Sequence, residues 1–228
     1  MNKFNFVKGI ILFVLITSIN TMNAQNNADS LNARQQSLVN ISALTATGNL
    51  DQLKIQLNKG LNAGLTINEI KEALTQLYAY CGFPRSLNAI NTFRSVLDER
   101  VAKGIKDSAG KEIIVENKVP DKYEQGRKVL EMLTKTTQLK PAPGFGEFAP
   151  RIDAFLKEHL FADIFASDVL SFQQRELVTL AALAAMPGVE AQFQSHIGMG
   201  MNTGITTEQI IIILDIIEKS VGKEQAEA

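Results

Sequence analysis

Two residues in the C-terminal half of the chain could transfer protons together. Glu176 stands near the expected start of one helix, and His196 lies in the middle of the next, beside Phe193, Ile197 and Met199. A helix hairpin can bring such side chains into contact, and a carboxylate that orients an imidazole is a common way to hold a general base near neutral pH. Two structural interpretations stay open. The first turn of a helix favours any acidic residue, and a histidine among apolar neighbours can be a core residue.

Further candidate residues lie on both sides of this pair. Arg85 and Arg175 could bind a substrate carboxylate through the planar guanidinium group, or could form ion pairs with Glu176 or another acid. Tyr80 and Phe83 belong to the segment YAYCGFPR (78–85) and are expected to bind substrate with the arginines.

Cys81 lies in the same segment, and we interpret it as a packing residue. It continues an apolar stripe formed by Ile70, Leu74 and Leu77. An unreactive buried cysteine behaves as a small hydrophobic residue, so this position favours a place in the core over the role of nucleophile.

The composition narrows the possible chemistry. The chain has 228 residues, with 23 Lys and Arg, 24 Asp and Glu, two His and one Cys. A single cysteine excludes an internal disulfide, and two His with one Cys fall short of a typical zinc site unless carboxylates complete it. We therefore expect acid–base chemistry, binding or scaffolding, and no metal site.

The N-terminus has the layout of a secretory signal peptide. Lys3 and Lys8 precede the apolar run Ile10–Ile16, and a polar stretch ends at Ala24. The run is shorter than the ~20 residues of a membrane-spanning helix. We predict cleavage after Ala24 and export to the periplasm or the medium. The mature chain then has 21 basic and 24 acidic residues. This balance predicts no nucleic-acid partner, and no membrane attachment after cleavage.

The rest of the chain contains an internal repeat. Leu31–Leu44 matches Leu170–Leu183 at an offset of 139 residues, and the offset becomes 140 after a turn at Pro187-Gly188. The second part of the match pairs Gly60, Asn62, Gly64, Thr66, Ile70 and Leu74 with Gly200, Asn202, Gly204, Thr206, Ile210 and Leu214. Domain duplication explains this spacing. We divide the chain into a signal peptide (1–24), a first copy (25–100), a connector (101–150) and a second copy (151–228).

Each copy has the pattern of packed helices. Leu50, Leu53, Leu57 and Leu61 recur at steps of three to four residues, which is typical of an apolar helix face. The pairs Thr66 with Glu69 and Thr206 with Gln209 have capping-box spacing at equivalent places in the two copies. Further helices are expected near 121–133, within the connector, and near 152–165, leading into the second copy. The sequence therefore predicts an all-α fold with tandem repeats.

The two copies differ where chemistry is expected. The first copy has Ser37 in place of Glu176 and Gln56 in place of His196, while the second copy keeps only the glycine of the segment YAYCGFPR. Each copy thus lacks what the other retains. We infer one composite pocket, built from both copies or from neighbouring subunits, with the Gly-Phe-Pro turn as one wall.

Three segments resemble the carboxymuconolactone decarboxylase family in its two-repeat form. They are YAYCGFPRSLNAINTF (78–93), LSFQQRELVTLAALAA (170–185) and SHIGMGMNTGITTEQI (195–210). The resemblance implies an alkyl hydroperoxidase D-like helical fold and a homo-oligomer, either a trimer or a hexamer. One branch of the family decarboxylates γ-carboxymuconolactone without a cofactor. The alkyl hydroperoxidase D-like branch uses a Cys-x-x-Cys pair, a histidine and a glutamate relay.

This resemblance assigns a relay to Glu176 and His196 but places no cysteines beside them. The cysteine positions of the peroxidase branch fall on Val189 and Gln192, and in the first copy on Asn49 and Gln52. A thiol–disulfide cycle therefore lacks its nucleophile. We expect a cofactor-free acid–base lyase or isomerase that acts on a small lactone or carboxylic acid. The alternatives are family-type peroxidase or peroxiredoxin activity, and a non-catalytic oligomeric binding protein.

Overall fold

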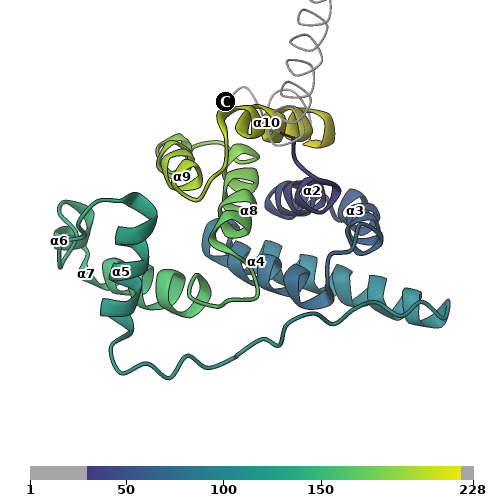
Figure 1. Ribbon diagram of the computed structural model, residues 1–228, viewed down its shortest axis with the longest axis horizontal. Helices are drawn as coiled ribbons and strands as arrows, with labels where there is room; N and C mark the ends of the chain where they lie inside the picture. The colour runs from purple at the N-terminus through teal and green to yellow at the C-terminus, as the bar shows by residue number, and fades with distance from the viewer. Residues whose placement is uncertain (1–29, 222–228) are drawn as a thin grey trace, which may run out of the picture.

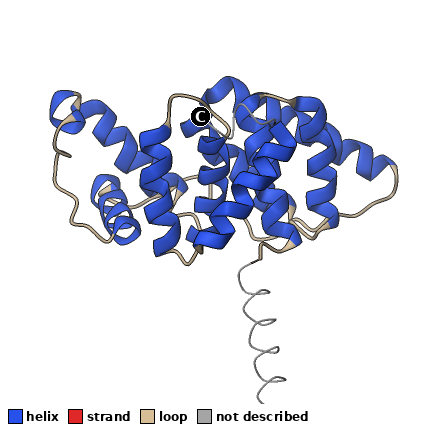
Figure 2. Ribbon diagram, turned by 90° about the horizontal axis from the view of Figure 1, so that it is seen from above, coloured by secondary structure: helices blue, strands red, loops and turns tan. Residues whose placement is uncertain are grey.

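The computed structural model describes residues 30–221, and every regular element within that range is a helix (Figure 2). The predicted signal peptide lies outside the described residues. The helices are α2 (Ala33–Thr47), α3 (Leu50–Asn62), α4 (Ile67–Ala102), α5 (Lys122–Thr134), α6 (Phe145–Phe148), α7 (Pro150–Ala154), the π-helix η1 (Phe155–Ile164), α8 (Phe172–Ala184), α9 (Glu190–Asn202) and α10 (Thr207–Val221). No helix between residues 30 and 221 is long and apolar enough to span a bilayer.

The duplication is visible in equivalent helices. Helices α2, α3 and the first part of α4 correspond to α8, α9 and α10 (Figure 1). A methyl group added at Gly60 on α3 would lie 3.2 Å from Ile41 Cδ1 on α2, and one added at Gly200 on α9 would lie 3.1 Å from the equivalent Leu180 Cδ1 on α8. The two helix crossings are equally close because glycine occupies the contact point in both copies. The expected tandem helical fold is confirmed.

The copies share one apolar core rather than two. Helix α2 packs against α8, while α10 covers α2 and α4 covers α8 (Figure 1). Buried side chains of the two first helices, among them Leu38, Leu44, Leu177 and Val178, belong to one cluster. Each copy's third helix therefore contacts the other copy's first helix, which places residues of α4 beside those of α8.

Helix α4 contains a kink where the sequence predicted a turn. Gly82 has φ 82° and ψ 158°, and the chain resumes a helix around Pro84 that continues to Ala102. A positive φ favours glycine, and proline fits the first turn of the helical segment that follows. The Gly-Phe-Pro segment therefore joins two helical segments within α4.

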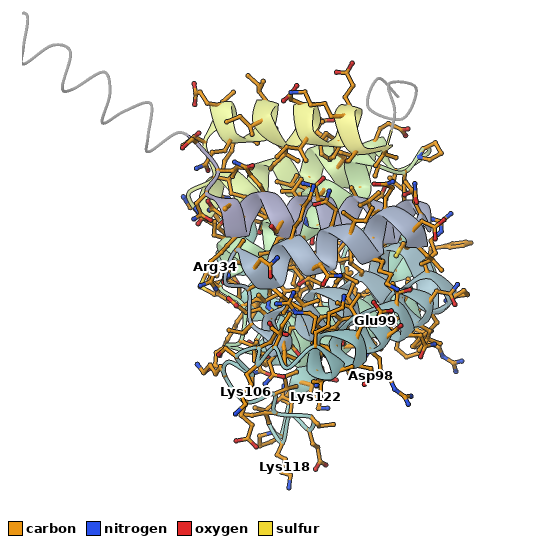
Figure 3. The ribbon with its side chains drawn as sticks, turned by 90° about the vertical axis from the view of Figure 1, so that its right-hand side faces the viewer. Arg34, Asp98, Glu99, Lys106, Lys118 and Lys122 are labelled. Atoms are coloured by element: carbon orange, nitrogen blue, oxygen red, sulfur yellow. The ribbon has the colours of Figure 1, made fainter. Side chains whose placement is uncertain are left out.

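The connector first runs along α4 and then forms a second, smaller core. The backbone amides of Ile67 and Asn68 donate to the carbonyl groups of Ser108 and Ala109, over 2.9 and 3.0 Å. In Figure 3, Lys106 and Lys118 of this segment lie at the lower end of the molecule. Helix α5 then packs against η1 through an apolar cluster that includes Val129, Leu133, Leu160, Phe161 and Phe165.

The helix expected near 152–165 exists, but most of it has π-helical geometry. Helix α7 ends at Ala154, and η1 follows without a break. The amide of Phe165 donates to the carbonyl of Leu160 over 2.9 Å, which is the five-residue spacing of a π-helix. At the crossing with α5, a Cβ on Gly126 would overlap the carbonyl oxygen of Lys157. Helix α5 can approach η1 this closely because Gly126 has no side chain.

Candidate active site

The structure brings Glu176 and His196 into direct contact. His196 Nδ1 lies 2.8 Å from Glu176 Oε2. The Glu176 side chain is fully buried, and the imidazole is 8% exposed. Glu176 is the fifth residue of α8, beyond the first turn, so a favourable helix-dipole position does not account for it. In a neutral imidazole whose Nδ1 donates to a carboxylate oxygen, Nε2 presents its lone pair.

Tyr80 of the first copy covers this second nitrogen. Its hydroxyl oxygen lies 3.5 Å from His196 Nε2, and the two rings meet edge to face with centroids 5.5 Å apart. Burial raises the pKa of Tyr80, and the nearby Glu176 charge raises it further. The phenol is therefore neutral near pH 7 and can donate a hydrogen bond. The contact joins the two copies within one chain, because α4 supplies Tyr80 and the second copy supplies the pair.

A buried polar seam continues from Tyr80 along the contact between α4 and α8. Glu72, Gln76 and Tyr80 follow one another at four-residue steps on α4. Gln76 Nε2 donates over 2.9 Å to the carbonyl of Arg175 and over 2.9 Å to the hydroxyl of Thr179. These hydrogen bonds fix the position of α8 against α4, and therefore the distance between Tyr80 and the pair.

Arg175 lies inside this seam with no exposed surface. Its Nη2 is 3.0 Å from Glu72 Oε2 and donates over 2.8 Å to the carbonyl of Ser167, while Nη1 donates over 3.1 Å to Gln76 Oε1. Burial lowers the pKa of Arg175, and the hydrogen bond with Glu72 opposes this effect. Of the two roles considered for Arg175, the structure shows the ion pair, with Glu72 as its partner.

The other two predicted binding residues lie on the far side of the kink. Phe83 is 61% exposed and stacks on Tyr78, with ring centroids 4.4 Å apart. Arg85 is exposed, and its Nη1 lies 3.6 Å from Met186 Sδ. The kink at Gly82 therefore separates Tyr80, which reaches the pair, from Phe83, which faces another part of the surface.

The first copy has no carboxylate–imidazole pair at the position equivalent to Glu176 and His196. A cavity of about 570 Å³ there is lined by residues that include Asn40, Gln56 and Ser220. These are the counterparts of Thr179, His196 and Tyr80 under the repeat offsets. Ser37, the counterpart of Glu176, donates to the carbonyl of Ala33 over 2.8 Å. The carboxylate–imidazole–phenol arrangement thus occurs in only one half of the residues that the structure describes.

Sequence reasoning missed Glu72, Gln76 and Thr179. A signal for the first two was present, because the repeat offset pairs them with Ile212 and Ile216 on α10. The third helix carries polar residues at these positions in the first copy and apolar residues in the second. Buried polar residues are not needed for packing, so this difference indicates a polar contact specific to the first copy. Comparison of the copies along the third helix would have found it.

The structure also shows the surroundings of Cys81 and of the residues that could bind a metal ion. Cys81 is half-buried against the apolar core, its Sγ donates to the carbonyl of Leu77, and burial raises the pKa of its thiol to about 11. At pH 7 the thiolate is scarce, which agrees with a packing role. Over the described part of the chain, no three or more His, Cys, Asp or Glu side chains gather where they could hold a metal ion.

Comparison with known proteins agrees with this architecture. The sequence profile of the carboxymuconolactone decarboxylase family matches residues 17–94 and 150–228, once for each copy. No curated protein matches the chain. The two matched regions cover more than half of the sequence and contain both the α4 segment and the Glu176–His196 pair. The chain therefore belongs to the carboxymuconolactone decarboxylase family.

Proposed function

We propose that this protein is a cofactor-free acid–base enzyme of lyase or isomerase type, with a small lactone or carboxylic acid as substrate. The observation that carries this proposal is the buried contact of 2.8 Å between Glu176 and His196, with the other imidazole nitrogen directed at Tyr80. Such an arrangement supplies a base, a group that orients it and a neutral hydrogen-bond donor.

In the proposed reaction, His196 Nε2 takes a proton from a carbon next to the substrate carbonyl, or returns one to it. Glu176 accepts the hydrogen bond from Nδ1 and stabilises the imidazolium that forms. The Tyr80 hydroxyl donates to the substrate oxygen as negative charge develops on it. Proton transfer by a positioned base typically contributes ~10²–10⁴-fold in rate, and exclusion of water from the buried pair strengthens these interactions.

Substrate can reach Nε2 only if Tyr80 moves, because the imidazole is 8% exposed and its free nitrogen faces the phenol. Tyr80 stands two residues before the kink at Gly82, at the end of the first helical segment of α4. Because Tyr80 covers His196 Nε2, a second candidate function is a non-catalytic binding protein that kept the fold and part of the site. A thiol peroxidase is disfavoured, because the thiol of Cys81 has no second cysteine in the chain.

The proposal extends to assembly and location. We propose that the chain is exported after cleavage near Ala24, on the basis of its N-terminal sequence. We also propose a homo-oligomer, a trimer or a hexamer, as the family resemblance implies. Sedimentation of the mature protein and the N-terminal sequence of the exported chain test these two statements.

The catalytic proposal is tested with two matched histidine variants. His196→Asn and His159→Asn each remove one of the two histidines in the chain. Turnover of γ-carboxymuconolactone and of other small lactones is followed by the loss of lactone absorbance. We expect His196→Asn to lose at least ~10²-fold in kcat while its melting curve still shows a folded protein at the assay temperature, and His159→Asn to keep activity. Equal activity of wild type and His196→Asn refutes the proposal, and a wild type that binds lactones without turnover supports the binding protein.

A further inference from the structure

A second candidate site lies in the connector half of the molecule. A groove of about 680 Å³ runs between the kink of α4 and the segment that contains α6, α7 and η1. We call it the aromatic groove, and its principal lining residues are Tyr78, Phe83, Phe145, Ile152, Phe155 and His159. Neither Glu176 nor His196 lines it. Phe83, Phe145, Ile152 and Phe155 are each more than half exposed, which is unusual for large apolar side chains that cluster on one face.

The wall of the groove is a stack of rings. Tyr78 and Phe83 lie face to face with centroids 4.4 Å apart and planes inclined by 24°. The imidazole of His159 is 5.5 Å from the Tyr78 ring on a tilted plane. A ring of a bound molecule can pack against this wall in the offset or edge-to-face geometry that aromatic pairs prefer, so the wall suits a flat aromatic molecule.

The polar residues of the groove lie together at one side. His159 Nδ1 is 3.1 Å from Asp163 Oδ2, and Lys122 Nζ is 2.9 Å from Asp163 Oδ1. His159 and Asp163 both lie on η1, four residues apart. With Nδ1 directed at a carboxylate, Nε2 of a neutral His159 is an acceptor, and the imidazole is 49% exposed. This pair repeats the carboxylate–imidazole arrangement of the first site in an open position.

The charges around the groove select for a neutral ligand. Asp163 and Lys122 form an ion pair, and Glu158, which also lines the groove, adds a further negative charge. An anionic ligand would be repelled, whereas a hydroxyl group can donate to His159 Nε2. The volume lies within the range of ~300–1,000 Å³ that is typical of small-molecule sites.

We propose that the aromatic groove binds a small, uncharged aromatic alcohol of the phenol class. The ring packs against Tyr78 and Phe83, and the hydroxyl donates to Nε2 of His159. Asp163 holds the imidazole in the tautomer that accepts this hydrogen bond. This site is independent of the proton-transfer site, since it uses a different histidine and a different acid.

The experiment uses 1-naphthol, with naphthalene and 1-naphthoate as comparison ligands of the same ring size. Binding to the mature protein at pH 8 is followed by calorimetry and by the imidazole NMR signals of the two histidines. We expect 1-naphthol to move the His159 signal and to leave the His196 signal in place. We expect it to bind at least about tenfold more tightly than 1-naphthoate. In His159→Phe, the advantage of 1-naphthol over naphthalene, about three- to tenfold in the wild type, should disappear.

Two exposed phenylalanines supply the matched control. Phe155→Ser removes an apolar wall of the groove, while Phe148→Ser changes a more exposed phenylalanine outside its lining. Only the first should weaken 1-naphthol binding, and both should keep the wild-type melting curve. An unmoved His159 signal or equal weakening in both variants overturns the proposal. It is also overturned if sedimentation shows self-association that Phe155→Ser abolishes and 1-naphthol fails to bind, because the groove is then an interface between copies.

Discussion

Removal of the Tyr80 ring should expose His196 to a reagent that the wild-type protein excludes. Diethyl pyrocarbonate acylates an imidazole nitrogen that carries a lone pair and can be reached from solvent. The two histidines have side-chain exposures of 8% for His196 and 49% for His159, a ratio of about six. His196 Nε2 is in addition covered by the Tyr80 hydroxyl at 3.5 Å. We therefore expect His159 to react at least about sixfold faster than His196 in the wild type.

Two variants separate the ring from its hydroxyl. Tyr80→Ala removes the ring and should raise the rate for His196 toward that of His159, which serves as an internal control. Tyr80→Phe keeps the ring and should preserve most of the protection, because the ring blocks the approach to Nε2. Because a Tyr80→Ala change in a packed site can cost several kcal/mol, its circular dichroism melt must show a folded protein at the assay temperature.

The assay is peptide mass spectrometry at successive reaction times, which reads the two histidines separately in one sample. The reasoning is refuted if His196 reacts as fast as His159 in the wild type. It is also refuted if Tyr80→Ala folds normally and leaves the ratio unchanged. The first result would mean that the reagent reaches His196 by a route that does not pass Tyr80. The second would mean that groups other than Tyr80 exclude the reagent from His196.

Three further predictions concern stability and reactivity. Gly126→Ala should lower the free energy of unfolding by about 3 kcal/mol or more, because the added Cβ overlaps the backbone of η1. The control in urea unfolding is Gly198→Ala, which should be neutral or stabilising because a Cβ there meets nothing within 4 Å. With a thiol pKa of about 11, Cys81 should react with iodoacetamide at pH 8 roughly 10²-fold more slowly than a free cysteine, and its rate should rise with pH up to about pH 11. Reaction at the rate of a free cysteine at pH 8 would contradict this. The hydrogen bond from Arg100 lowers the pKa of Asp107, so the pair stabilises the fold above the unfolded-state pKa of about 3.9, and this contribution disappears as the pH falls through the lower folded value. In urea unfolding at several pH values, the stability difference between wild type and Asp107→Asn should shrink toward acidic pH. A pH-independent difference would exclude this linkage.

The local features of this fold could be predicted because they depend on neighbouring residues. Helix starts at Thr66 and Thr206 follow from capping residues three positions before a glutamate or glutamine, and both capping interactions exist in the structure. The duplication could also be predicted from the sequence, because the two copies share helix caps, glycines and apolar stripes at equivalent positions. The glycines at equivalent helix crossings show that this match reflects a shared packing geometry.

The candidate site was predicted in part. The contact between Glu176 and His196 was expected because both lie on one helix hairpin, 20 residues apart. The use of Arg175 was not decided by sequence, because its partner Glu72 lies 103 residues away and on another helix. Spacing along the chain contains no information about which of several acids an arginine will reach once helices cross.

The sequence by itself determined the helices, the duplication, the family and the carboxylate–imidazole pair, since caps and periodic apolar residues act over a few positions. Only the tertiary structure decided that Tyr80 closes the pair, that α4 bends at Gly82 instead of ending there, and that His159 stands in an aromatic groove. These features arise where α4 crosses α8 and η1, and the free energy that selects them comes from packing and charge pairing between residues that are far apart in the chain.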